Sequence, residues 1–189
     1  MNDVRDQNIY QNNSLLPPAL WDTDLKNDLC KALTDEKKKN CIKDEKDIAL
    51  FDYIVTNPPF GSQSGAKIND NDILKQYDLS YNYEQIVFPK CEKCNPDKEI
   101  LITKENPDGL FATDRLSSSR KPEIIFIERC YQLLKPGGTL AIVLPDAILG
   151  APGKENAGTR KWILQKFNII ASIDLHVYTF EPATGTNTS

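Results

Sequence analysis

An asparagine, two prolines and a phenylalanine follow one another at residues 57–60, directly after the apolar run FDYIVT at residues 51–56. The run predicts a buried strand, and because proline cannot donate to a strand ladder, the chain must turn where this strand ends. In open α/β sheets ligands bind at the carboxyl ends of the strands. A turn there would present an amide side chain, rigid carbonyls and an aromatic ring to a planar ligand that carries an amino group.

Transfer of a group to such an amine is the chemistry that these residue types could do. An exocyclic amine is a poor nucleophile because its lone pair is delocalised into the ring, so a catalyst must hold it and present it to an electrophile. The Asn57 side-chain oxygen and the Pro58 carbonyl are suitable acceptors, and Pro58 and Pro59 fix the backbone φ angle. Phe60 offers a face on which an extruded base can stack. The alternative interpretation is an ordinary turn after a strand, with Phe60 as a core aromatic.

Four further segments predict the elements that position this turn. Residues 122–134 begin with proline and then carry apolar side chains at helical spacing, and KPGG at residues 135–138 ends this helix. The apolar residues 139–144 and 169–175 predict two more strands, and residues 156–167 predict a helix between them. Alternating strands and helices predict an α/β fold with right-handed crossovers and a mostly parallel sheet flanked by helices.

Three blocks carry a resemblance to a known family: NPPFG at residues 57–61, KPEIIFIERCYQLLKPGGTLAIVLPDAILG at residues 121–150, and TFEPATGTNTS at residues 179–189. In this order they resemble the modification (methyltransferase) subunits of type I restriction-modification systems. Those subunits are adenine-N6 DNA methyltransferases that use S-adenosylmethionine. The resemblance implies a partial Rossmann-like methyltransferase fold whose first strands are absent. NPPF alone is shared with enzymes that methylate RNA guanine or a protein glutamine amide, so RNA and protein remain alternative substrates.

The resemblance also implies which residues act on the substrate. The catalytic residues would be Asn57, Pro58, Pro59 and Phe60. Of these, Asn57 and the Pro58 carbonyl would accept hydrogen bonds from the target amine, and Phe60 would stack on an adenine flipped out of duplex DNA.

Three residues further along the chain would complete the pocket for the base. Phe180 resembles the second aromatic of the family's base pocket, with a core phenylalanine as the alternative. Pro145 and Asp146 follow the next predicted strand and should line the same cleft, although Asp146 could instead cap the following turn.

The cofactor site is predicted to be incomplete. No glycine precedes residue 61, so the glycine-rich nucleotide turn of the family cannot form there. Residues 9–15 resemble the family's third cofactor segment, with Asn13 at the matching position and Ser14 and Leu15 beside it. An ordinary turn asparagine is the alternative. We therefore expect residues 1–189 to form a single partial catalytic domain that is inactive by itself.

Composition and charge limit the partners. With 189 residues, 40% of them hydrophobic, the chain can bury one core, and it has neither a long apolar run nor a signal peptide. We expect a cytoplasmic protein without a membrane partner. A net charge of −4 argues against gripping duplex DNA directly. In the resembling systems a separate specificity subunit reads the DNA, alongside other restriction-system subunits. A non-catalytic assembly remnant that self-associates through an exposed sheet edge is a further hypothesis.

The spacing of the five cysteines does not favour a zinc site, because zinc ribbons usually show two close pairs and here there is only one. Cys91 and Cys94 form a CxxC pair, which Cys30 and Cys41 could complete as a zinc site. Free thiols are the preferred interpretation, because an odd count without an export signal argues against a disulfide framework. Cys130 should lie in the core. Residues 61–121, polar and rich in proline, predict an insertion of short helical or hairpin pieces beside the active-site cleft.

Overall fold

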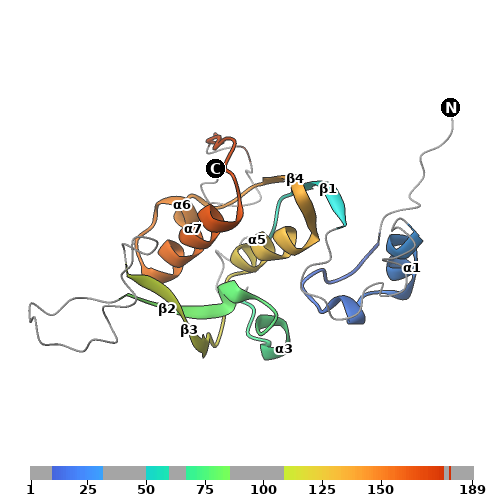
Figure 1. The fold of residues 1–189 in the computed structure, drawn as a ribbon, viewed down its shortest axis with the longest axis horizontal. Helices are drawn as coiled ribbons and strands as arrows, with labels where there is room; N and C mark the ends of the chain where they lie inside the picture. The colour runs from blue at the N-terminus through green and yellow to red at the C-terminus, as the bar shows by residue number, and fades with distance from the viewer. Residues whose placement is uncertain (1–9, 32–49, 60–66, 86–108, 177–178, 180–189) are drawn as a thin grey trace, which may run out of the picture. The chain divides into compact units, whose positions relative to one another are not determined.

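Two compact units make up the α/β chain (Figure 1). The first unit combines Met1–Thr56 with Phe126–Ile142, and the second combines Asn57–Ile125 with Val143–Ser189. Among the described residues, no helix has the length and apolarity needed to cross a membrane. The computed structural model describes residues 10–31, 50–59, 67–85, 109–176 and 179.

A parallel strand pair forms the centre of the first unit. Strand β1, Phe51–Thr56, lies beside β4, Leu134–Ile142 (Figure 1). The ladder is irregular at its start, because residues 135–138 loop out between the first two paired positions. Gly137 adopts φ 79° in this loop, which glycine tolerates without a steric penalty. The predicted strand at residues 51–56 and its parallel pairing are therefore confirmed.

The remaining elements of the first unit are helical. The helix α5, Pro122–Leu133, begins with proline at its first position, as predicted, and ends directly before β4. Its last two turns belong to the first unit. The 3-10 helix η1, Pro18–Leu20, and the helix α1, Thr23–Lys31, precede β1 in the chain.

Arg129 of α5 fixes the segment before α1. Arg129 is 2% exposed, and its guanidinium group donates to the carbonyl oxygens of Leu15, at 3.3 Å, and Leu16, at 3.1 Å. It also donates to Gln132 Oε1 at 2.8 Å and lies 5.8 Å from the centroid of the Trp21 ring. A buried cation must be paired or hydrogen-bonded, so these contacts explain why an arginine can occupy this core position.

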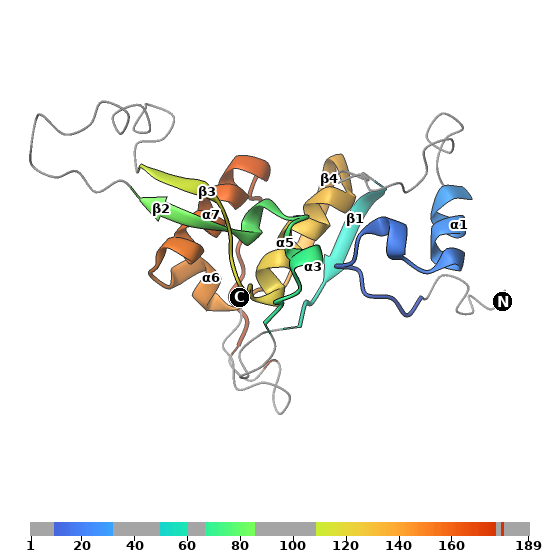
Figure 2. The same ribbon diagram turned by 90° about the horizontal axis from the view of Figure 1, so that it is seen from below.

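The second unit contains an antiparallel pair and two neighbouring helices. Strand β2, Tyr81–Gln85, pairs with β3, Leu110–Leu116 (Figure 2). The helix α7, Lys154–Lys166, contacts both strands and follows the short helix α6, Asp146–Gly150. Two short elements, α3 at Asn71–Leu74 and the 3-10 helix η2 at Asp78–Ser80, precede β2. The predicted helix at residues 156–167 is thus confirmed, although α7 begins two residues earlier and ends one residue earlier. The predicted insertion at residues 61–121 contains the antiparallel strands β2 and β3.

Arg120 joins the elements of the second unit. The side chain is 5% exposed and donates to the carbonyl oxygens of Leu79, at 2.9 Å, and Tyr81, at 2.7 Å. It also donates to Ser117 Oγ at 3.1 Å and lies 3.5 Å from a carboxylate oxygen of Glu155 on α7. Burial lowers the pKa of Arg120, and the neighbouring Glu155 carboxylate opposes this shift.

Two sequence-based expectations about strands are wrong. Residues 169–175 form no strand, and Ile170 and Ile173 are 82% and 71% exposed. A strand needs a neighbour for its backbone N–H and C=O groups, and no described strand pairs with this segment. Strand β1 is not buried either, since Tyr53 and Val55 are 77% and 85% exposed. Its only partner among the described strands is β4, and no described element covers these two side chains.

Gly158 of α7 is expected to be intolerant of a side chain. A Cβ atom there would lie 2.4 Å from Cγ of Tyr83 on β2. The root of the tyrosine ring cannot swing aside, so Gly158→Ala should force α7 away from the strand pair and cost about 1–3 kcal/mol in free energy of unfolding. This cost outweighs the gain of roughly 1 kcal/mol in helix propensity. Urea denaturation monitored by circular dichroism measures the difference.

Gly150, at the end of α6, is the matched control. An added Cβ meets no atom within 4 Å there, so Gly150→Ala should be neutral or slightly stabilising. Tyr83→Ala in the Gly158→Ala background should relieve the clash, which a double-mutant cycle would detect as coupling. Equal stabilities of the two glycine variants would contradict close packing of α7 on β2.

Candidate active site

The predicted catalytic turn leaves the carboxyl end of β1 without regular secondary structure. Asn57 and Pro59 are exposed and Pro58 is buried. Burial of the Pro58 ring restrains the backbone on both sides of it, whereas the Asn57 amide is accessible to a ligand. Phe60 lies outside the described residues.

A second segment leaves the strand pair at the same edge. Thr56 pairs with Ile142, and because the strands are parallel, the residues after both of them continue from one end of the sheet. Pro145 is buried and flanks the start of α6, where its carbonyl oxygen accepts a hydrogen bond from Ile148 N at 2.9 Å. The Asn57 turn and the Pro145 turn therefore both follow strands that end at one edge of the pair.

Asp146 is the exposed first residue of α6. The residue that flanks this helix is Pro145, and no side chain caps its first turn. The alternative of Asp146 as a cap is therefore wrong, and its carboxylate is accessible at the start of α6.

Asn13, Ser14 and Leu15, the predicted cofactor residues, lie in the first unit. Asn13 Oδ1 accepts a hydrogen bond from Leu15 N at 3.1 Å, and the Asn13 carbonyl oxygen accepts one from Leu16 N at 3.1 Å. This is the local turn geometry that asparagine favours. The turn-asparagine alternative is thus borne out, and a ligand would have to use the remaining hydrogen-bonding capacity of the exposed amide. Ser14 is half-buried and Leu15 is 6% exposed.

The cysteines differ from the prediction at one position. Cys30 is disulfide-bonded, so the prediction of free thiols is wrong there. Cys130 is free and buried in α5, as predicted, and its burial raises the pKa of the thiol to about 11. Within the described ranges, no group of three or more histidine, cysteine or acidic residues could hold a metal ion. Cys41, Cys91 and Cys94 lie outside the described residues, as does Phe180.

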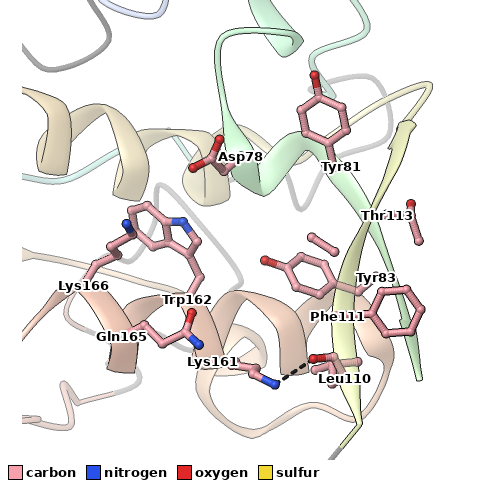
Figure 3. Close-up of a pocket in the computed structure, with 11 residues that line it drawn as sticks. Asp78, Tyr81, Tyr83, Leu110, Phe111, Thr113, Lys161, Trp162, Gln165 and Lys166 are labelled. Atoms are coloured by element: carbon pink, nitrogen blue, oxygen red, sulfur yellow. Dashed lines mark hydrogen bonds between the residues drawn. The ribbon is translucent and has the colours of Figure 1, made fainter. Parts of the chain in front are cut away.

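A pocket of about 680 Å³ lies in the second unit, at residues that the sequence did not single out (Figure 3). Tyr81 and Tyr83 line it from β2, Phe111 lines it from β3, and Trp162 lines it from α7. The alternating tyrosines of β2 can be read from the sequence. Which helix packs against them depends on the tertiary structure, so the sequence alone does not reveal the pocket. None of the predicted site residues lines this pocket.

Comparisons of the chain with protein-family models, with curated proteins and with solved structures find no match. The resemblance to type I modification subunits consequently stays a prediction. It depends on NPPFG, on the block at residues 121–150 and on the ending at residues 179–189.

Proposed function

We propose that this chain carries the target-amine site of an S-adenosylmethionine-dependent adenine-N6 DNA methyltransferase of a restriction-modification system. The single observation that supports this proposal is the parallel pairing of β1 with β4, which sends the Asn57 and Pro145 turns from one edge of the sheet. That edge is where open α/β sheets bind ligands. A partial Rossmann-like methyltransferase fold is part of the same proposal.

The residues at this edge would act by holding the adenine amine. Asn57 Oδ1 and the Pro58 carbonyl each accept one N–H of the amine, and the buried Pro58 ring restrains the acceptors before the substrate arrives. Holding both hydrogens orients the nitrogen lone pair toward the electrophile, which lowers the entropic part of the barrier. Phe60 and Phe180 are proposed to stack on the flipped base. The amine proton departs to water after the nitrogen has been alkylated, so no general base is required.

The cofactor fits the chain only in part. S-adenosylmethionine supplies an electrophilic methyl group when it is bound, and Asn13 offers an amide for its adenine ring. No glycine-rich turn precedes Asn57, because the first glycine of the chain is Gly61. A second polypeptide is proposed to supply the rest of the cofactor pocket, and DNA is proposed to be read through a separate specificity subunit.

A radioactive methyl-transfer assay tests this function. The 189-residue chain is incubated with tritiated S-adenosylmethionine, alone and with a polypeptide that supplies a glycine-rich cofactor turn, on duplex DNA, RNA and protein. We expect no turnover by the chain alone, and N6-methyladenine in digested DNA for the reconstituted enzyme. Calorimetry should likewise show no micromolar binding of S-adenosylmethionine to the chain alone.

Each alternative function predicts a different result in the same assay. Methylguanine in RNA or methylglutamine in protein would replace DNA as the substrate. A non-catalytic assembly role is favoured by the exposed apolar side chains of Tyr53 and Val55 on β1, which another chain would cover. That role predicts no transfer to any substrate, even in the reconstituted mixture, and such a result would overturn the proposed activity.

A further inference from the structure

The pocket between the β2–β3 pair and α7 has aromatic walls. Tyr83 stands on β2 opposite Ala112 of β3, and Trp162 comes from α7. Phe111 pairs with Glu84, the neighbour of Tyr83, so its ring lies on the other face of the strand pair (Figure 3). Tyr83 extends from its strand toward α7 (Figure 3), where its ring packs against Gly158. Tyr83 on a strand and Trp162 on a helix thus provide flat surfaces for a planar ring.

Positive charge lies on one side of this pocket. Lys161 and Lys166 both line it from α7, whereas Asp78 is the one acidic residue in its lining. Lys161 Nζ donates a hydrogen bond to the Leu110 carbonyl oxygen at 2.7 Å, which holds the ammonium group at the pocket wall (Figure 3). The net charge of the lining is therefore positive although the whole chain carries −4.

Size and chemistry together select a class of ligand. A volume of about 680 Å³ falls within the usual range for small-molecule sites. Flat apolar surfaces favour an aromatic ring, lysines favour an anion, and Asp78 can accept a hydrogen bond from an amino or hydroxyl group. A nucleotide unites a planar base, hydroxyl groups and a phosphate in one molecule of suitable size.

We propose that this pocket binds a nucleotide, with its base between Tyr83 and Trp162 and its phosphate toward Lys161 and Lys166. The nucleotide can be free or part of a single strand, since both present the same base and phosphate. None of these residues belongs to the proposed methyl-transfer site, so this inference does not depend on the proposed function.

Nuclear magnetic resonance on the full 189-residue chain, labelled with ¹⁵N, tests the proposal with adenosine 5′-monophosphate as the probe. The chain has two tryptophans, and Trp162→Phe identifies the indole N–H signal that belongs to the pocket. We expect saturable movement of the Trp162 signal while the Trp21 signal stays in place.

Adenosine and ribose 5-phosphate should each bind about tenfold more weakly than the nucleotide, because adenosine lacks the phosphate and ribose 5-phosphate lacks the base. A single-stranded pentanucleotide that binds more tightly than the mononucleotide would identify a strand as the source, and equal binding would identify a free nucleotide; both results support the pocket.

Single substitutions test where the base and the phosphate of the nucleotide bind. Tyr83→Leu should weaken binding about fivefold or more, because it removes a stacking surface but keeps an apolar side chain beside Gly158. Lys166→Gln, at an exposed position, should weaken binding severalfold and reduce its salt dependence without unfolding the chain. Lys154→Gln is the matched control, because Lys154 is exposed on α7 but does not line the pocket.

Asn57→Ala should leave nucleotide binding at Trp162 unchanged, which separates this pocket from the proposed methyl-transfer site. A Trp162 signal that does not move at millimolar nucleotide would overturn the proposal. Equal binding of ribose 5-phosphate and the nucleotide would do so as well, as would wild-type affinity of both Tyr83→Leu and Lys166→Gln.

Discussion

Replacing Arg120 with alanine is expected to lower the free energy of unfolding by about 3 kcal/mol or more, because each buried polar group left without a partner costs about 1–3 kcal/mol. The guanidinium group donates to carbonyl oxygens of Leu79 and Tyr81 and to Ser117 Oγ, and it lies beside Glu155. Alanine would leave these acceptors without their donor in a site where Arg120 itself is only 5% exposed. Urea denaturation gives the free energy from the midpoint and the slope of the transition.

Arg115→Ala is the matched control, because Arg115 also forms an ion pair, with Glu84, but is 70% exposed in its side chain. Exposed pairs contribute under about 1 kcal/mol, so this variant should stay close to the wild type. Arg120→Lys should fall between the two, since lysine keeps the charge but loses the planar array of donors. A loss at Arg120→Ala no larger than that at Arg115→Ala would show that the network does not stabilise the second unit.

Local patterns were sufficient for the elements whose ends are set by proline or glycine. Strand β1 ends where two prolines follow it, and α5 begins at Pro122 and ends before Lys135-Pro136-Gly137-Gly138. These signals act within a few residues, so one sequence reveals them. Parallel pairing of β1 with β4 also followed from the strand–helix–strand order.

Residues 169–175 show where local patterns fail. Their apolar residues are typical of a strand, yet a strand exists only where a neighbour takes up its backbone groups. No described strand pairs with this segment, and Ile170 is 82% exposed. Whether an apolar segment forms a strand therefore depends on a neighbouring strand elsewhere in the fold. The periodicity of the segment itself does not show whether such a neighbour exists.

Buried charge is the other feature that sequence reasoning missed. Arg120 and Arg129 are 5% and 2% exposed, although arginine is almost never fully buried without partners. Half of the partners given above are backbone carbonyl oxygens, which every residue possesses, so side-chain patterns in the sequence do not mark these sites. The pocket at Trp162 was missed for a related reason, because it depends on which helix packs against the β2–β3 pair.

Asn57→Ala is expected to reduce methyl transfer by the reconstituted enzyme about a hundredfold or more, with little change in affinity for S-adenosylmethionine. The substitution removes one of the two acceptors proposed for the adenine amine, and loss of alignment at a reacting atom has an effect of this size. Asn57 is exposed at the carboxyl end of β1, so the fold should not depend on its side chain. Single-turnover transfer of tritiated methyl groups gives the rate, and calorimetry on the same mixture gives the cofactor affinity.

The control for this variant is Asn168→Ala, an exposed asparagine after α7 that has no place in the proposed site. It should transfer methyl groups at the wild-type rate.

Phe60→Ala should have a smaller effect than Asn57→Ala, about 1–3 kcal/mol in binding of the flipped base, because stacking on an aromatic ring is worth that much. Phe60 is proposed to contact the base and Asn57 its amine, so the two variants should affect different steps of the reaction. Phe60→Ala weakens binding of DNA, whereas Asn57→Ala slows transfer from DNA that is already bound. Wild-type turnover by Asn57→Ala would remove this residue, and with it the catalytic role of the turn after β1, from the proposed mechanism.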